Sequence, residues 1–268
     1  MRLAFIADIH GNTPALEAVL DDLSHESVDE VLVLGDTVLK LGDGPGAVAM
    51  LSQIRHQAVY GNMEWAVLTH GTTDYPEHWG PIAGEEVHFA AIDIAQTRAT
   101  LGKEFFQRLQ ATIRLETPAG TLLACHGSPD SCVTDLQGHI ELTSPWAQDD
   151  VDFTRRLGAG NDVPIVVCSH THTPFVRRSG STLVINSGAV GWSRAPVADR
   201  YKTRYMILTL ETGRNPRIDW RALPYDNQAA LTAFRQKQAS IESQLRSDDA
   251  RAASRTWHDY LATMIIPH

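Results

Sequence analysis

Short apolar runs alternate with helix-like patterns over the first sixty residues of the chain. Buried strands are predicted for three apolar runs: 2–8, 30–36 and 56–62. Apolar residues recur at helical spacing in the two intervening stretches: 13–23 and 44–54. For the first of these helices, Thr13 is the predicted N-cap and Pro14 the predicted first helical residue. Strands that alternate with helices predict βαβ units and a sheet that begins mostly parallel.

The rest of the chain reads as one helical stretch, a strand-rich region and a second helical stretch. Residues 66–110 are predicted to form a helical elaboration over one end of the sheet, interrupted near Gly102. A hairpin is predicted at 111–127, around a Pro/Gly turn, and a helix near 145–157. Three further segments are strand-rich: 163–170, 175–188 and 205–223. Helices are predicted from about Asn227, and residues 1–268 are interpreted as a single domain of two packed sheets flanked by helices.

Several of the predicted strands are followed by residue types that bind metals. These residues are Asp8, His10, Asp36, Asn62, His126, His170 and His172. Ligands in open α/β sheets collect at the carboxyl ends of the strands, so we expect these side chains to converge. Carboxylate, amide and imidazole ligands without a thiolate suit hard or borderline cations. The ordered set predicts a site for two metals, an arrangement that commonly supports phosphoryl chemistry.

Six stretches carry a resemblance to a known family: FIADIHGN (5–12), LVLGD (32–36), VYGN (59–62), CHGSP (125–129), SHTHTP (169–174) and INSGAVG (185–191). With them the chain resembles the calcineurin-like metallophosphoesterase superfamily, and within it the small bacterial and archaeal phosphodiesterase branch. The resemblance implies an α/β fold, a four-layer α/β/β/α sandwich of two mixed sheets flanked by helices. It also implies a dinuclear metal centre.

The resemblance further implies a role for each residue of the set. Asp8, His10 and His172 would hold the first metal, whereas Asn62, His126 and His170 would hold the second. Asp36 would bridge the two. A hydroxide between the metals would attack phosphorus, with Asp36, Asn62 and His126 as the catalytic residues. Manganese is the expected metal, with iron, nickel, cobalt or zinc as alternatives.

Asn12 and Arg194 are the candidate substrate-binding residues. Asn12 matches a family position near the site, and Arg194 follows the 185–191 motif, where its guanidinium could bind a phosphate. The stretch TVLKLGDGP (37–45) departs from the family pattern, in which Gly-Pro follows Asp36 sooner. We therefore expect the edge of the site formed by this stretch to differ from that of other family members.

Met63 stands where many family members carry a histidine. A thioether cannot donate a proton, and losing a general acid costs about 10²- to 10⁴-fold on poor leaving groups. We therefore expect a phosphodiesterase that prefers good leaving groups. His70, His78 and His88 are candidate replacement acids, although solvated loop histidines are the more ordinary interpretation. Two alternatives stay open: a phosphomonoesterase or dinucleoside-polyphosphate hydrolase on the same centre, and a non-catalytic scaffold of this fold.

Four other residues are expected to play structural roles. Glu64 is predicted to support the start of a helix, and Trp192 to pack under a loop. Arg177 and Arg178 are adjacent in a predicted strand, so they should face opposite sides at the surface.

Composition limits the partners. The formal net charge of −9 disfavours non-specific nucleic-acid binding, and no apolar run approaches the ~20 residues that span a bilayer. Cys125, Cys132 and Cys168 are too few for a disulfide framework, and the N-terminal stretch does not resemble a signal peptide. A cytoplasmic protein acting on a small, nucleotide-like phosphorylated substrate is expected, with a homo-oligomer left open.

Overall fold

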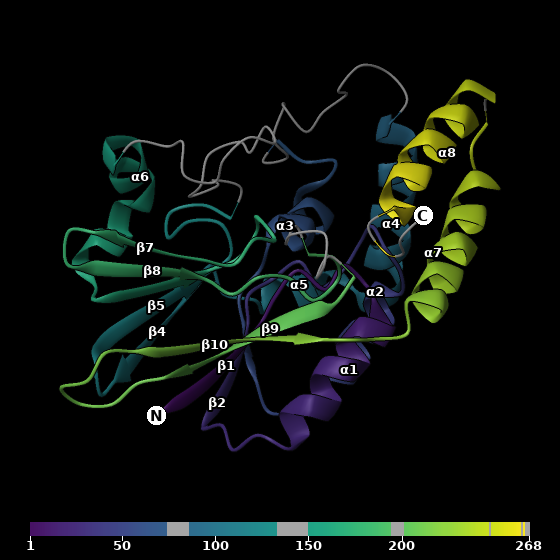
Figure 1. The fold of residues 1–268 in the computed structure, drawn as a ribbon. Helices are drawn as coiled ribbons and strands as arrows, with labels where there is room; N and C mark the ends of the chain where they lie inside the picture. The colour runs from purple at the N-terminus through teal and green to yellow at the C-terminus, as the bar shows by residue number, and fades with distance from the viewer. Residues whose placement is uncertain (74–85, 133–149, 194–200, 247, 264, 266–268) are drawn as a thin grey trace.

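The fold is built on two five-stranded sheets that pack face to face (Figure 1). The computed structural model describes residues 1–73, 86–132, 150–193, 201–246, 248–263 and 265. The first sheet has the order β10-β9-β1-β2-β3, with bounds Arg217–Leu223, Thr203–Thr209, Arg2–Ile6, Glu30–Val33 and Gln57–Ala58. The second has the order β4-β5-β6-β8-β7, with bounds Thr112–Thr117, Gly120–Cys125, Ile165–Cys168, Thr182–Asn186 and Phe175–Ser179.

Both sheets are mixed, as the resemblance implied. In the first sheet β1 pairs with β2 and β2 with β3 in parallel, which confirms the predicted parallel start, whereas β9 is antiparallel to β1. In the second sheet β5, β6 and β8 are parallel neighbours. The hairpin of β4 and β5 is antiparallel and also confirmed.

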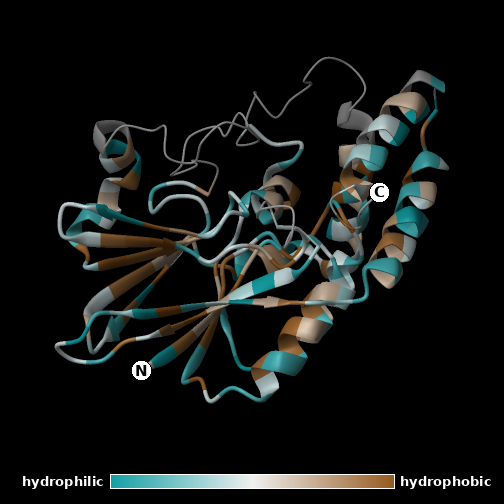
Figure 2. Ribbon diagram, viewed as in Figure 1, coloured by the Kyte–Doolittle hydropathy of each residue, from teal (hydrophilic) through white to brown (hydrophobic). Residues whose placement is uncertain are grey.

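Side chains on β1 alternate between two cores because successive residues of a strand face opposite sides. Leu3 and Phe5 point between the sheets, where they join Leu122 and Val167 in the central core. Ala4 and Ile6 point outward, toward the helices. Figure 2 shows the matching apolar stretches along the strands. Burial on both faces explains why the strands read as short continuous apolar runs.

Helices cover both outer faces, which confirms the four-layer sandwich. Helices α1 (Thr13–Ser24) and α2 (Gly44–Leu51) pack on the first sheet. Helix α6 (Asp150–Leu157), followed by a 3-10 helix (Gly158–Asp162), covers the second. The remaining helices gather beside the first sheet (Figure 1): α3 (Asn62–Thr69), α4 (Glu86–Leu101), α5 (Lys103–Gln107), α7 (Asn227–Glu242) and α8 (Asp248–Ala262).

Two of the element boundaries that differ from the prediction lie beside candidate ligands. The N-cap of α1 is Asn12 rather than Thr13, because the Asn12 side chain accepts a hydrogen bond from the backbone N–H of Ala15 at 3.2 Å. Strand β3 is limited to two residues of the predicted seven-residue run, Gln57 and Ala58. The helical break at Gly102 is confirmed, and of the helix predicted near 145–157 the part 145–149 lies outside the described residues.

None of the helices in the described parts of the chain combines the length and apolar character needed to cross a membrane.

Candidate metal centre

The predicted metal-binding side chains lie together at one end of the two sheets. Asp8 and His10 follow β1, Asp36 follows β2, and Asn62 begins α3 after β3. His126 follows β5, and His170 and His172 follow β6 in the second sheet. All of them are buried except His170, which is half-buried. The expected convergence is therefore observed, and the side chains come from both sheets.

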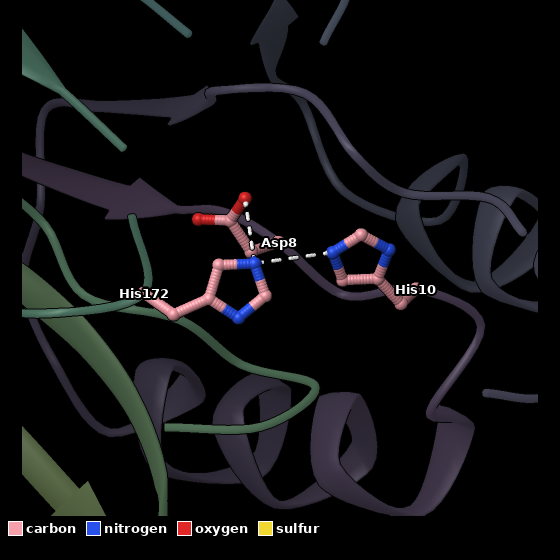
Figure 3. Close-up of side chains that lie close together, drawn as sticks. All are labelled: Asp8, His10 and His172. Atoms are coloured by element: carbon pink, nitrogen blue, oxygen red, sulfur yellow. Dashed lines mark hydrogen bonds and ion pairs between the residues drawn. The ribbon is translucent and has the colours of Figure 1, made fainter. Parts of the chain in front are cut away.

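Asp8, His10 and His172 form the first group, with one ligand atom from each within 4.8 Å of the others. Nε2 of His172 lies 3.3 Å from Nε2 of His10 and 3.5 Å from Oδ1 of Asp8 (Figure 3). The side chains point toward one another, as the close-up shows. This is the trio expected to hold the first metal.

Asp36, His126 and His170 form the second group by the same distance measure. The side-chain oxygen of Asn62 joins them, because it lies 2.9 Å from both His126 Nε2 and His170 Nδ1. These two ring nitrogens are only 3.2 Å apart. The second predicted trio is thus gathered around one point.

Asp36 lies between the two groups. Its Oδ2 atom is 3.6 Å from His10 Nε2 in the first group, and its Oδ1 atom is 3.5 Å from His126 Nε2 in the second. One carboxylate oxygen therefore faces each group. This is the placement that a bridging ligand requires.

The donor atoms suit divalent cations. Imidazole nitrogens face one another at 3.2 and 3.3 Å, where the approaching lone pairs favour a shared cation. Asp8 Oδ1, which faces His172 Nε2, is buried without a hydrogen-bond partner among the described residues, and such an atom calls for an explanation. Oxygen and nitrogen ligands without sulfur match manganese, iron or zinc. The residues present therefore fit the implied cations.

Five of the candidate ligands have left-handed backbone. The φ angles are 53° at Asp8, 51° at His10, 53° at Asp36, 72° at His170 and 61° at His172. This conformation costs about 1–2 kcal/mol for each residue other than glycine. Hydrogen bonds between the loops offset it, for example from His10 N–H to the Asp36 carbonyl at 2.8 Å. Such strained backbone concentrates at functional sites.

Backbone carbonyls orient two of the histidines. The Leu34 carbonyl lies 2.6 Å from His126 Nδ1, and the Trp192 carbonyl lies 3.0 Å from His172 Nδ1. A carbonyl only accepts, so each Nδ1 carries a proton and each Nε2 is the ring nitrogen that faces the cluster.

The sequence predicted only a helix-start role for Glu64, and the structure shows a second role. Its carboxylate is 2% exposed and accepts hydrogen bonds from the backbone N–H groups of Asp36, Thr37, Val38 and Gly61, at 2.7–3.3 Å. The bond to Gly61 caps α3, which confirms the predicted helix-start role. The other bonds hold the loop that carries Asp36. The available signal was the capping-box spacing, with glutamate three residues after the cap.

Ionisable groups inside the cluster shift one another's pKa values. Burial raises the pKa of Asp8 to about 8. Burial alone would also raise the pKa of Asp36, but the positive charge and close contact of His126 outweigh it and hold that pKa well below its usual range. Burial lowers the pKa of His126, yet the Asp36 and Asp8 carboxylates outweigh it and raise that pKa to about 9. The buried carboxylates therefore attract positive charge, as a cation site must.

Met63 contributes to the centre through its backbone. Its N–H donates to Asp36 Oδ1 at 2.8 Å, and its side chain packs on the apolar cluster formed with Val38 and Val67. Any residue other than proline can supply this backbone contact. His70 caps the opposite end of α3 from Asn62, about 12 Å along the helix axis. His78 and the side chain of His88 lie outside the described residues.

Of the two candidate substrate-binding residues, the structure describes Asn12. The side-chain amide of Asn12 donates to the Gly191 carbonyl at 2.7 Å while its oxygen caps α1. Its substrate-binding role stays a prediction. Arg194 lies outside the described residues. Arg178 is exposed on β7, whereas the Arg177 guanidinium lies over the Phe153 ring at 4.1 Å, so neither belongs to the cluster.

Trp192 packs directly against the first group. Its ring centroid is 4.4 Å from that of His10 and 4.1 Å from that of His172. The ring is 7% exposed, which confirms the predicted packing role.

Comparisons with known proteins agree with this architecture. The chain is 24% identical over 203 residues to the phosphodiesterase YfcE of Escherichia coli K12, covering 71% of this chain and 79% of that protein. It is 26% identical over 192 residues to an uncharacterized protein of Methanocaldococcus jannaschii, MJ0912, covering 70% of this chain and 69% of that one.

Solved structures share the fold. A metallophosphoesterase from Sphaerobacter thermophilus superposes with a TM-score of 0.63 at 20% identity, covering 95% of this chain and 98% of the other. The hypothetical protein PH1004 from Pyrococcus horikoshii OT3 gives a TM-score of 0.65 at 15% identity, covering 94% and 97%. The family described as calcineurin-like phosphoesterase superfamily domain matches residues 1–213. With this match, the chain belongs to the calcineurin-like phosphoesterase superfamily.

Proposed function

We propose that this phosphoesterase is a metal-dependent phosphodiesterase that works with two divalent cations, manganese first among them. One observation carries the proposal: two groups of ligand-type side chains lie side by side, and Asp36 directs one carboxylate oxygen toward each. A single-metal site would need only one such group.

Asp8, His10 and His172 would hold one cation, and Asn62, His126 and His170 the other, with Asp36 shared. When bound, such cations supply a nucleophile from water at neutral pH and neutralise charge on phosphoryl oxygens. The protein contributes rigidity, because strained loops, backbone carbonyls and Glu64 fix each ligand before substrate arrives. That preorganisation reduces the reorganisation needed during reaction.

The preference for diesters with good leaving groups rests on Met63. Its side chain has no proton to donate and instead packs in an apolar cluster. His70 lies at the far end of α3 from Asn62, about 12 Å along the helix axis, which argues against it as a replacement acid. Substrates whose leaving group departs without protonation are therefore favoured. The phosphodiesterase name of the Escherichia coli relative supports the same reaction class.

The test compares bis(p-nitrophenyl) phosphate with p-nitrophenyl phosphate. The protein is stripped of metal, resupplied with Mn²⁺, and assayed alongside Asn62→Ala and His126→Ala. His25→Ala serves as the control, because His25 is an exposed histidine at the end of α1. We expect metal-dependent diester cleavage that the two site variants abolish and the control retains.

Other outcomes would redirect the proposal. Preferential cleavage of the monoester would favour a phosphomonoesterase on the same centre. No turnover with any divalent ion, despite bound metal, would favour a non-catalytic scaffold. A rate among aryl diesters that is independent of leaving-group pKa would contradict the argument from Met63.

A further inference from the structure

The segment 169–174 carries one candidate ligand of each group and crosses over the end of a strand. It joins β6 to β7, and these two strands pair with β8 on opposite sides. In the registers of these pairs, Asn186 at the end of β8 lies opposite Cys168 at the end of β6 and Phe175 at the start of β7. The connection therefore passes over the last residue of β8.

The side-chain amide of Asn186 holds this connection from below. Asn186 is 0% exposed, and its Nδ2 atom donates to the Ser169 carbonyl at 2.7 Å and to the Thr171 hydroxyl oxygen at 3.2 Å. Its Oδ1 atom accepts a hydrogen bond from the Gly188 N–H at 2.9 Å. A backbone N–H only donates and a carbonyl only accepts, so the orientation of the amide is fixed by its partners.

The two residues that Asn186 holds alternate with two candidate ligands. Ser169 and Thr171 flank His170, and Thr171 also precedes His172. Both histidines have left-handed backbone, with φ of 72° and 61°, which is unfavourable for residues other than glycine and persists where the surroundings impose it. His170 belongs to the second ligand group and His172 to the first, so one buried amide supports both groups.

Ser169 extends this support to a third candidate ligand. Its hydroxyl oxygen lies 3.1 Å from the Leu34 carbonyl oxygen and 3.1 Å from Nδ1 of His126. Its backbone N–H donates to the His126 carbonyl at 2.8 Å. Ser169 is itself 1% exposed. The hydrogen bond from Asn186 therefore holds a residue that also contacts the ligand-bearing end of β5.

We propose that the side-chain amide of Asn186 positions His170 and His172 for metal binding and thereby aligns the two ligand groups. The inference rests on the proposed function, since it concerns the ligands of the two cations. Residues that hold ligands in place commonly change metal affinity about 10- to 100-fold when they are altered. The group that faces the Ser169 carbonyl must donate, so an amide meets the requirement and a carboxylate does not.

The test measures manganese affinity by calorimetry and the electron paramagnetic resonance spectrum of the manganese-saturated protein. Asn186→Asp keeps the shape of the side chain but sets an oxygen against the Ser169 carbonyl. Thr171→Val removes the hydroxyl that accepts from Asn186, and Thr171→Ser restores it. Thermal unfolding of each metal-free variant is followed separately, so a loss of stability is not mistaken for a loss of alignment.

The matched control is Asn161→Asp. The Nδ2 atom of Asn161 also donates to two backbone carbonyls, both at 3.0 Å, but this residue is exposed on the 3-10 helix after α6. The chemical change is the same as in Asn186→Asp. It should leave manganese affinity and the spectrum as in the parent.

We expect Asn186→Asp to lower manganese affinity about 10- to 100-fold. Thr171→Val should lower it about 3- to 10-fold, the size of one neutral hydrogen bond, and Thr171→Ser should stay within about twofold of the parent. The saturated parent should give the spectrum of a spin-coupled manganese pair, and Asn186→Asp should convert part of it to that of isolated Mn²⁺. A role in packing alone would lower the unfolding temperature and change neither readout.

Manganese affinity of Asn186→Asp within about twofold of the parent would overturn the inference. If this variant does not fold, Thr171→Val decides by the same criterion. An equal loss of affinity in Asn161→Asp would also overturn it, because the effect would then not depend on the connection over β8.

Affinity and spectrum are measured without turnover, so the two proposals fail separately. A parent protein that binds manganese through this arrangement but cleaves no diester would reject the phosphodiesterase proposal alone. A parent spectrum of isolated Mn²⁺ only would reject the two-cation part of that proposal, and the affinity of the Asn186 variant would still test the positioning role.

Discussion

The carboxylate of Glu64 accepts a hydrogen bond from the backbone N–H of Asp36 at 2.8 Å, and the same oxygen accepts one from Gly61 at 2.8 Å. A single buried side chain thus joins the loop after β2 to the start of α3. The first of these segments carries the shared candidate ligand, and the second carries Asn62. This contact therefore helps to set the distance between the two segments that carry these candidate ligands.

Replacing Glu64 with glutamine is expected to loosen the centre. Each carboxylate oxygen accepts two backbone N–H groups, so the –NH₂ group of Gln would face two donors in either orientation. We expect Glu64→Gln to lower manganese affinity about 10- to 100-fold, as for other residues that orient ligands. Titration with Mn²⁺ measures this.

The control for Glu64 is Glu17→Gln, an exposed position on α1. It should leave manganese affinity and thermal unfolding unchanged. Parental affinity in Glu64→Gln would show that the Asp36 loop holds its shape without this carboxylate.

Glycine is required at position 61 because there is no room for a Cβ, and not because of its backbone dihedral angles. Its φ of −98° suits any residue, but an added Cβ would lie 2.2 Å from Asp36 Oδ1 and 2.9 Å from His126 Cε1. We expect Gly61→Ala to displace Asp36 and abolish metal binding. Elemental analysis of the purified variant measures the bound metal.

Gly71→Ala provides the comparison, since a Cβ there would meet nothing within 4 Å although φ is +85°. That change should cost about 1 kcal/mol of stability and leave the metal in place. Equal metal content in Gly61→Ala and Gly71→Ala would contradict the argument that a Cβ at position 61 displaces Asp36.

Metal affinity should rise with pH. The pKa of His126 is raised to about 9, so below that pH the metal-free protein holds a proton that a cation must displace. The pKa of Asp8, raised to about 8 by burial, adds a second such proton. Apparent manganese affinity should therefore increase from pH 6 to about 9 and then level off.

Calorimetry in two buffers with different ionisation enthalpies would count the protons released at pH 7. Release of at least one proton for each protein molecule is expected. A manganese affinity that does not change between pH 6 and about 9 would contradict the raised pKa values of His126 and Asp8.

Asn12 offers a test of two roles. Removing its cap should cost about 1 kcal/mol, so Asn12→Ala should lower the free energy of unfolding by that amount. Asn12→Asp keeps the capping oxygen but loses the bond to Gly191. Urea unfolding measures the free energy of unfolding of both variants. A rise above tenfold in their KM for bis(p-nitrophenyl) phosphate, with an unchanged free energy of unfolding, would assign Asn12 to substrate binding instead.

Much of the centre could be predicted from the sequence because its ligands follow strands. Apolar runs ending at Asp8, Asp36 and His126 marked the strand ends, and parallel strands direct those ends to one edge. The assignment of β5 and β6 to a second sheet did not follow from the pattern, since buried strands of either sheet read alike.

The backbone conformations of the candidate ligands could not be predicted from the sequence. The left-handed conformations of Asp8 and His170 depend on hydrogen bonds to residues distant along the chain: the Asp8 N–H donates to the Gly35 carbonyl, and the His170 N–H donates to Asp8 Oδ2. Glu64 shows the same limit, because three of its four donors lie more than twenty residues away. The cap of α1 was misplaced by one residue since Asn12 and Thr13 are both good capping types.

The most direct test of the central claim is an anomalous-difference map from a crystal grown with Mn²⁺. We expect two peaks about 3.5–4 Å apart on either side of the Asp36 carboxylate, a separation typical of two-metal sites. Asp8, His10 and His172 should surround one peak, and Asn62, His126 and His170 the other. A single peak, or none at these side chains in fully loaded protein, would contradict the two-cation account.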